Sequence, residues 1–312
     1  MKVGTYRGGD PGAFQGTCIH TSIQNAISRD RFKIISSKLY FASPTKPLGC
    51  AKTYIDDVIQ CLKGTFQKCR HNSNFQSIDE SMTKFKGRLS LERYMLSNPV
   101  KREIKLWLIS DSFTGYTHDL NIYMGRETER LDATLGERVV NELISTAKEK
   151  DITFSFDRFF TSTALLQNID YAPCSKDGPL FVKWQDTKEV LMLSNCHNVN
   201  VVYVNKTLKN GSKSSIPCPE MIPSYGEIMG GVDFADQMME LYELDRKSNK
   251  LWKKVSYCLF MVAVVNAKII YKEKTKKKIS FQQFLLPSGE RNDSRREKNS
   301  ICAAFIEERK TI

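Results

Sequence analysis

The fold is set by the stretch Lys105-Leu106-Trp107-Leu108-Ile109-Ser110-Asp111, an apolar run that ends in a carboxylate. A short apolar run bounded by turn residues is typical of a buried β-strand. A second run, Ile152–Phe156, ends in the same way at Asp157, and Asp233 follows the pair Gly230-Gly231 at the start of an amphipathic stretch. Two carboxylates at strand ends and one at a helix start have the chemistry that a pair of divalent metal ions requires.

The alternative is that each of these carboxylates is a turn or helix-cap residue, and spacing alone favours that interpretation for any one of them. The helix adds further acidic side chains, since Asp233 and Asp236 share one face and Glu240 lies four residues further on. Carboxylates so close repel each other unless a cation lies between them, which favours a metal site. A solvated acidic face at a helix N-terminus is the other interpretation.

The remaining hydrophobic pattern predicts an α/β fold in which a mixed sheet is flanked by helices. The middle of the chain has the order strand, hairpin, helix, strand, helix, and a small β-rich insertion follows it. The expected strands are 85–94, 105–110, 120–124, 152–156, 180–184, 190–193 and 199–204, and the expected helices are 22–40, 55–66, 136–148, 161–169, one that begins at 230–231, and 252–271.

Composition indicates a polyanionic partner. The 312 residues carry a formal net charge of +12, and neutralisation of phosphates by such an excess supplies most non-specific affinity for nucleic acid. The nine cysteines form no paired framework and have no zinc-site spacing, which indicates reduced thiols inside a cell. No apolar run reaches the ~18 residues of a membrane span, so no membrane association is expected.

Five short motifs follow one another along the chain: Ile78–Arg88 (IDESMTKFKGR), Asp111–Tyr116 (DSFTGY), Asp157–Ser162 (DRFFTS), Gly230–Gln237 (GGVDFADQ) and Arg246–Trp252 (RKSNKLW). Together they resemble the piggyBac family of DNA transposases, including its domesticated, transposable-element-derived members. The resemblance extends from about Arg29 to about Lys272, which is most of the chain.

The resemblance implies a ribonuclease-H-like fold in which Asp111, Asp157 and Asp233 are the catalytic, metal-binding triad and Asp236 is a further metal ligand. The implied cofactor is Mg²⁺ (or Mn²⁺). The implied chemistry is hydrolysis at a transposon end followed by attack of the freed 3′-hydroxyl on DNA, with joining at TTAA sites.

The implied partner is double-stranded DNA. Asp79 and Glu80 of the first motif are interpreted as structural partners of nearby basic residues. Trp252 is a candidate for stacking on a base, although burial at a helix start is at least as good an interpretation. The residues expected to contact DNA are Lys84, Lys86, Arg88, Lys101, Arg102, Arg246, Lys247, Trp252, Lys253 and Lys254.

The resemblance also divides the chain into three parts. Residues 1–76 match an N-terminal helical part used for dimerisation and DNA binding, and 77–272 match the catalytic core, with the β-rich insertion at about 178–225. Residues 273–312 form a basic tail without a cysteine-rich domain. A homodimer in the nucleus is the implied assembly and location.

Three departures from the family pattern lead us to expect impaired activity. The chain is short at its N-terminus, it stops before a cysteine-rich DNA-end-binding domain, and a sheet strand beside the one that carries Asp157 is missing after 161–169. A domesticated, catalytically silent nuclear DNA-binding protein is therefore the alternative function. A structure-specific nuclease with the same fold is a third possibility.

Overall fold

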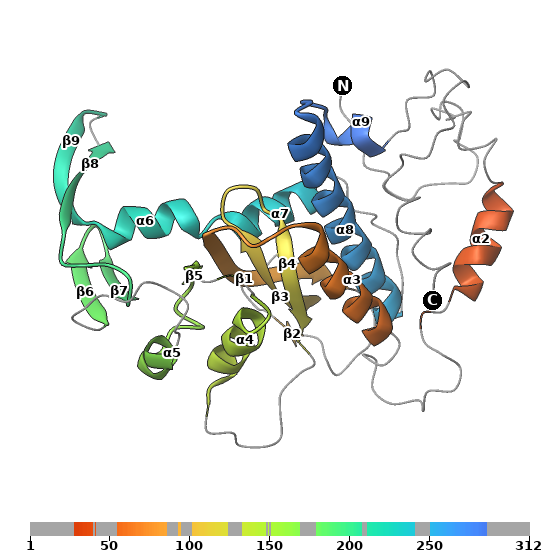
Figure 1. The fold of residues 1–312 in the computed structure, drawn as a ribbon, viewed down its shortest axis with the longest axis horizontal. Helices are drawn as coiled ribbons and strands as arrows, with labels where there is room; N and C mark the ends of the chain where they lie inside the picture. Colours follow the sequence, from red (N-terminus) through yellow and green to blue (C-terminus); the bar gives the residue numbers. More distant parts are fainter. Residues whose placement is uncertain are drawn as a thin grey trace.

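The computed structural model describes residues 28–39, 41, 55–85, 93–94, 102–123, 133–147, 149, 151–168, 179–207, 211–240 and 250–285 (Figure 1). Its centre is a mixed sheet in which β3 (Arg102–Asp111) pairs antiparallel with β1 (Phe75–Lys84), and β1 pairs parallel with β5 (Thr153–Phe156). On its other edge β3 pairs antiparallel with β4 (Thr117–Ile122) and with the two-residue β2 (Arg93–Tyr94).

Helices cover both faces of this sheet. Because successive strand residues point to opposite faces, Trp107 and Ile109 pack against α4 (Leu135–Ile144), while Leu106 and Leu108 belong to a second core. This second core is closed by α3 (Asp56–Cys69), α7 (Gly231–Glu240) and α8 (Leu251–Thr275). The predicted mixed sheet flanked by helices is thereby confirmed. The other helices are α2 (Arg29–Lys38), α5 (Thr163–Asn168), α6 (Met221–Ile228) and α9 (Phe281–Leu285).

The long helix α8 is the one described helix that is long and apolar enough to cross a membrane by length and composition. A core helix of a soluble protein meets the same criteria. Val255 and Leu259 are fully buried, and Val262 and Val265 are nearly so, all within the second core. In this structure α8 is therefore a core helix.

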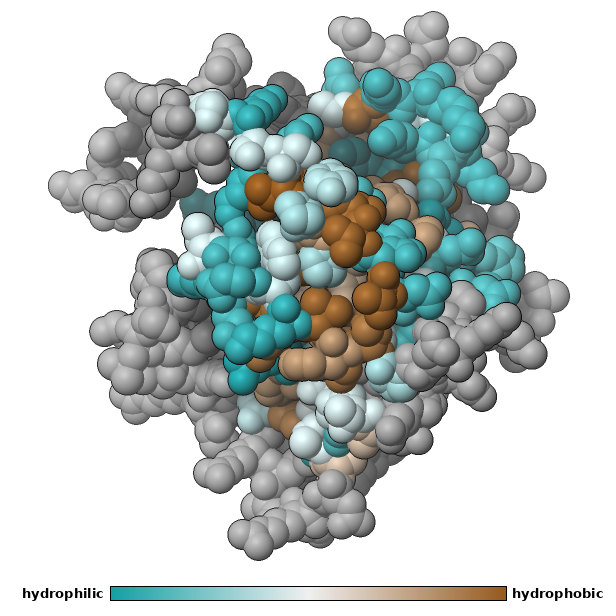
Figure 2. Space-filling model, turned by 90° about the vertical axis from the view of Figure 1, so that its left-hand side faces the viewer, coloured by the Kyte–Doolittle hydropathy of each residue, from teal (hydrophilic) through white to brown (hydrophobic). Residues whose placement is uncertain are grey.

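The β-rich insertion consists of two hairpins, one of β6 (Leu180–Gln185) and β7 (Glu189–Ser194), the other of β8 (Val201–Thr207) and β9 (Lys213–Pro219). Figure 1 shows them at one end of the molecule, joined through α6 to the core. The predicted insertion is confirmed, with one strand more than expected. Figure 2 views the molecule from this end, where apolar and hydrophilic residues mix on the surface. The exposed large apolar residues of the insertion are Phe181, Leu191, Val199, Val201 and Tyr203.

The strand expected at 85–94 lies largely outside the described residues, which omit 86–92; of this range the structure describes Phe85 and the short β2. The sequence did not predict β1 at Phe75–Lys84. The reason is that the β1 segment is polar: Gln76, Ser77 and Ser81 are buried there without an apolar signal. The expected loss of a strand beside β5 stays a prediction. Among the described residues β5 pairs only with β1, and 169–178 lie outside them.

Candidate active site

The parallel pairing of β1 with β5 brings two carboxylates together. Ile78 is the partner of Phe156 in this ladder, so the next residues, Asp79 and Asp157, lie level with each other on adjacent strands. Asp79 accepts a hydrogen bond from the Glu80 backbone N–H at 2.8 Å, and Asp157 accepts one from the Phe159 N–H at 2.8 Å. Each carboxylate is thus held at one oxygen by the backbone.

Helix α7 adds two more carboxylates because its first turn lies directly on the sheet. The Val232 N–H donates to Ser77 Oγ at 3.1 Å. A Cβ on Gly231 would lie 2.6 Å from Ser77 Oγ and 2.7 Å from the backbone oxygen of Asp111, so only glycine allows this approach. The helix then runs along β1 and places Asp233 near Asp79, and Asp236 beside Ser81.

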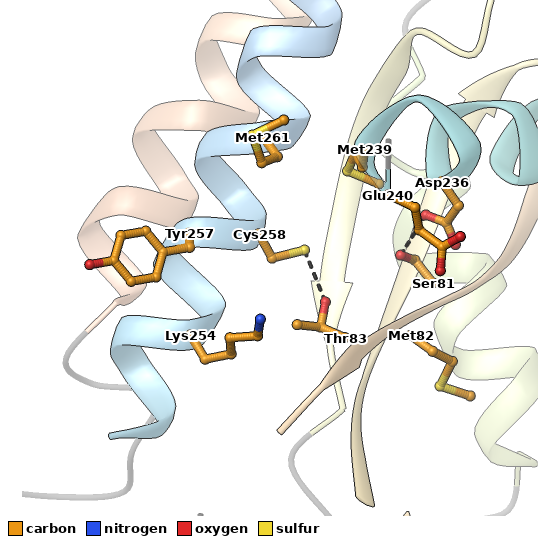
Figure 3. A pocket seen from close by; sticks show the side chains of 10 residues that line it. All are labelled: Ser81, Met82, Thr83, Asp236, Met239, Glu240, Lys254, Tyr257, Cys258 and Met261. Atoms are coloured by element: carbon orange, nitrogen blue, oxygen red, sulfur yellow. Dashed lines mark hydrogen bonds between the residues drawn. The ribbon is translucent and has the colours of Figure 1, made fainter. Parts of the chain in front are cut away.

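A second hydrogen bond joins α7 to β1 further along the helix: Ser81 donates to Asp236 Oδ1 at 2.7 Å, a bond drawn in Figure 3. Figure 3 also shows Asp236 and Glu240 beside a small hollow between β1, α7 and α8, with Lys254, Tyr257 and Cys258 on its other side. Asp79, Asp157 and Asp236 are half-buried and Asp233 is exposed, so the cluster is not sealed in the core.

The charges of this cluster are coupled. Burial raises the pKa of Asp79 to about 6, and the nearby charges of Asp157 and Asp233 add to the shift. Burial also raises the pKa of Asp236 to about 7, helped by Asp233 and Glu240 and opposed by the Ser81 hydrogen bond. No cation among the described residues forms an ion pair with Asp79, Asp157, Asp233 or Asp236.

Asp111 does not belong to this cluster, and its predicted convergence with Asp157 and Asp233 is wrong. In the antiparallel register Asp111 is opposite Gln76, whereas Asp79 is opposite Leu108. Strand alternation therefore puts Asp111 and Asp79 on opposite faces of the sheet. The Asp111 side chain is 3% exposed, and its Oδ1 accepts from the Thr114 N–H at 2.7 Å. It is a buried turn residue, the alternative that the sequence left open.

The Asp111 carboxylate instead links three elements through Arg70. Arg70 Nη1 lies 3.1 Å from Asp111 Oδ2, and Arg70 Nη2 lies 3.1 Å from Glu273 Oε1 on α8. Burial acts to raise the pKa of Asp111, but hydrogen bonds from Ser73 and Thr114 and the charge of Arg70 outweigh it, so this pKa is lowered. This network ties the end of α3 to the end of α8.

Replacing Arg70 by Met is expected to lower the free energy of unfolding by about 2 kcal/mol, because a buried carboxylate loses its charged partner. Urea denaturation measures this change. The matched control is Lys183→Met, which breaks the exposed Lys183–Glu189 pair and should cost less than about 0.5 kcal/mol. Equal effects of the two substitutions would contradict the role of Arg70.

A buried histidine beside this network makes stability depend on pH. Burial, helped by the charge of Arg70, lowers the pKa of His118 to about 4. At this residue the folded state therefore binds fewer protons than the unfolded state, so the contribution of His118 to stability is lost as the pH falls from about 6.5 towards 4. The raised pKa values of Asp79 and Asp236 act in the opposite direction over the same range. His118→Phe removes the destabilising contribution, so the melting temperature of the variant should rise relative to that of the unmodified chain as the pH falls through that range. A difference in melting temperature that stays the same at every pH would contradict this role of His118.

The two acidic residues of the first motif, Asp79 and Glu80, have different neighbours in the structure. Glu80 forms an ion pair with Lys105, as the sequence interpretation expected. Asp79 does not follow that interpretation, because it faces the acidic cluster. Tyr225 on α6 was not anticipated either: burial raises its pKa, and so do the charges of Asp157, Asp79 and Asp233. The sequence could have indicated Asp79 through one requirement: the strand-end carboxylate Asp157 needs a second carboxylate level with it on a neighbouring parallel strand.

The structure does not support two of the expected DNA contacts. Trp252 is 8% exposed and packs edge-on against Phe41, and Lys254 is 5% exposed. Both lie in the core at the start of α8 because α8 begins by packing on the sheet. Lys253 donates to the Ser36 backbone oxygen at 2.6 Å. Lys84 and Arg102 lie on β1 and β3, and the residues that fall outside the described part of the chain are Lys86, Arg88, Lys101, Arg246 and Lys247.

The four carboxylates fit a divalent metal ion by their chemistry. They are hard oxygen ligands from three elements, and a cation would relieve the burial and the mutual repulsion that raise the pKa values of Asp79 and Asp236. Within the described residues no three such side chains already lie close enough to enclose an ion. Binding would therefore require these side chains to turn towards a common point.

Comparisons with known proteins identify a matching family and several similar proteins. A family model described as transposase IS4 matches residues 13–172 and 168–268. The human protein PiggyBac transposable element-derived protein 3 is 24% identical over 313 residues, which cover 86% of this chain and 53% of that protein. The human PiggyBac transposable element-derived protein 2 is 23% identical over 292 residues, covering 80% and 48%. The chain thus spans about half the length of these relatives.

A solved structure, the cryo-EM structure of a piggyBac transposase synaptic complex with hairpin DNA, matches with a TM-score of 0.68. The match has 23% identity and covers 86% of this chain and 63% of that one. At this identity the likeness shows the fold, so the predicted ribonuclease-H-like architecture is confirmed.

Proposed function

The chain belongs to the transposase IS4 family, in its piggyBac type, and on this premise we propose that it carries out metal-dependent cleavage and transfer of DNA strands at TTAA sites. The observation that supports the activity most directly is the cluster of Asp79, Asp157, Asp233 and Asp236 on one side of the sheet. Burial and the neighbouring carboxylates raise the pKa values of Asp79 and Asp236, and such perturbed groups are concentrated at functional sites. We assign the metal site to this cluster and leave Asp111 out of it.

Asp79, Asp157 and Asp233 would hold Mg²⁺ or Mn²⁺, with Asp236 at the margin of the site. When bound, such ions activate a water or hydroxyl and stabilise charge on the phosphate. The chain's own residues supply the positions. The backbone N–H groups of Glu80 and Phe159 orient Asp79 and Asp157, and Ser81 orients Asp236.

The proposed substrate is double-stranded DNA, bound by a homodimer in the nucleus. Two facts support DNA as the partner: the net charge of +12, and the DNA held by the structurally similar piggyBac transposase complex. Asp79 and Asp157 are half-buried and Asp233 is exposed, so a phosphodiester could reach the cluster.

DNA binding should depend steeply on salt, because each phosphate that the protein neutralises releases counterions. The logarithm of affinity should fall by about 0.9 per phosphate contact for each unit of log salt. Fluorescence anisotropy with a labelled duplex at several salt concentrations measures the slope. An affinity that does not change with salt, or no binding at low salt, would contradict a nucleic-acid partner.

The activity is tested by an excision and strand-transfer assay on a TTAA-flanked donor with Mg²⁺ or Mn²⁺. Cleavage that requires the metal and is lost in Asp157→Asn and Asp233→Asn supports the proposal. Duplex binding without metal-dependent cleavage would favour the catalytically silent, domesticated DNA-binding protein. Cleavage of branched or hairpin DNA without strand transfer would favour a structure-specific nuclease.

A further inference from the structure

The β-rich insertion places a nucleophilic side chain next to a base. Cys196 and His197 follow β7 directly, and Cys196 Sγ lies 3.4 Å from His197 Nδ1. Ser194 Oγ lies 2.8 Å from the same nitrogen and 3.4 Å from Sγ. A thiol, an imidazole and a hydroxyl therefore meet at one point.

The end of β7 holds this arrangement in place. Ser194 is the last residue of β7, pairs with Leu180 in the ladder, and is 9% exposed. Its Oγ also accepts the Cys196 backbone N–H at 3.2 Å, which fixes the turn that brings Sγ towards the imidazole. Cys196 and His197 are themselves only half-buried, so a small molecule can reach the sulfur.

Charge around the pair favours transfer of a proton from sulfur to nitrogen. The hydrogen bond with Cys196 raises the pKa of His197, and the charge of Glu220, the residue before α6, adds to this against the effect of burial. Glu220 is held by Asn200 Nδ2 at 2.8 Å. Burial acts to raise the pKa of Cys196, but the hydrogen bonds from His197 and Ser194 and the charge of His197 outweigh it, so this pKa is lowered.

From this geometry we infer that Cys196 is a nucleophilic site at which soft electrophiles modify the chain covalently. The Sγ proton passes to His197 Nδ1, and the thiolate attacks the electrophilic carbon. With iodoacetamide an S–C bond forms, the C–I bond breaks and iodide leaves. The product thioether is neutral, so His197 returns its proton to solvent. This reactivity belongs to the insertion and does not use the carboxylate cluster.

Peptide-resolved alkylation tests the inference on the whole 312-residue chain. The protein is treated with limiting iodoacetamide at about pH 6.5, and the rates at Cys196 and at Cys61 are compared by mass spectrometry. Cys61 on α3 is exposed and serves as the internal reference. Because the thiolate is the reactive form, Cys196 should react about tenfold faster although it is less exposed. A rate equal to or below that of Cys61 overturns the inference.

Variants separate activation by His197 from simple accessibility. His197→Gln should lower the Cys196 rate to that of Cys61 and move its pH profile upwards, while Ser194→Ala should lower the rate by a smaller factor, because it removes the hydrogen bonds that hold the turn but leaves the base in place. If His197→Gln unfolds the insertion, the pH profile of the unmodified sequence still decides. The inference is overturned if the alkylation rate of Cys196 increases over the same pH range as that of Cys61. It is also overturned if His197→Gln leaves the Cys196 rate unchanged in a folded variant.

Discussion

Replacing Asp79 by Asn is expected to reduce metal-dependent DNA cleavage by at least about 1000-fold, since stabilisation of the transition state by a bound metal supplies several kcal/mol. Asp79 lies level with Asp157 on the neighbouring parallel strand, and the charges of Asp157 and Asp233 raise its pKa. Asn is close to Asp in size, so the sheet should remain intact. The measurement is the single-turnover cleavage rate on a TTAA-flanked duplex with saturating Mg²⁺, together with the thermal shift caused by Mg²⁺ or Mn²⁺.

The matched control is Asp111→Asn, because sequence alone assigned the metal to Asp111. This variant loses the charge that holds Arg70, so it should melt at a lower temperature while its metal-induced thermal shift persists. Asp79→Asn should do the opposite: it should remain stable and lose the shift. If Asp111→Asn abolishes metal binding in a folded protein and Asp79→Asn does not, the assignment made from the strand register is wrong.

Sequence patterns predicted the elements whose signal is local. The helix that begins at Gly230-Gly231 is α7 (Gly231–Glu240), and the hairpin expected at 180–184 and 190–193 is formed by β6 and β7. In both cases hydrophobic periodicity and glycine or turn residues lie within the element itself. β1 was missed because its residues pair on both sides with other strands, and buried polar groups such as Ser77 and Ser81 find their hydrogen-bond partners on α7, far along the chain.

The site was predicted in part for the same reason. Asp233 and Asp236 share a helix face, which three-residue spacing shows directly. Whether Asp79 or Asp111 joins them depends on which strand pairs with β5 and in which direction, and this is a property of long-range register. Both residues are carboxylates on long strands, but only β1 runs parallel to β5. The motif around Asp111 therefore marks a structural turn, held by Thr114 and Arg70.

Trp252 shows the corresponding limit for surface predictions. An aromatic residue beside Lys253 and Lys254 matches a nucleic-acid contact as well as a helix start. The structure buries Trp252 and Lys254 because α8 packs on α3, α7 and β1, with buried residues from Leu251 to Ile269. A basic run in sequence does not show which of its members face solvent.

The close contact of α7 with the sheet leads to the second large effect. Gly231→Ala should lower the free energy of unfolding by roughly 3 kcal/mol, since overpacking a tight contact costs this much when the neighbours cannot move. The added Cβ would lie 2.7 Å from the Asp111 backbone oxygen and 2.9 Å from Ser112 Cα, both of which belong to the backbone. Urea denaturation and thermal melting measure the loss.

The same substitution should also impair the site in molecules that remain folded. If α7 moves away from β1 to relieve the clash, Asp233 and Asp236 move away from Asp79, and a shift of ~1 Å in a catalytic group can cost ~100-fold in rate. Gly230→Ala is the matched control, since a Cβ there meets no atom within 4 Å, and it should leave both stability and metal binding almost unchanged. Equal melting temperatures and equal cleavage rates for the two alanine variants would show that α7 is not seated on the sheet through Gly231.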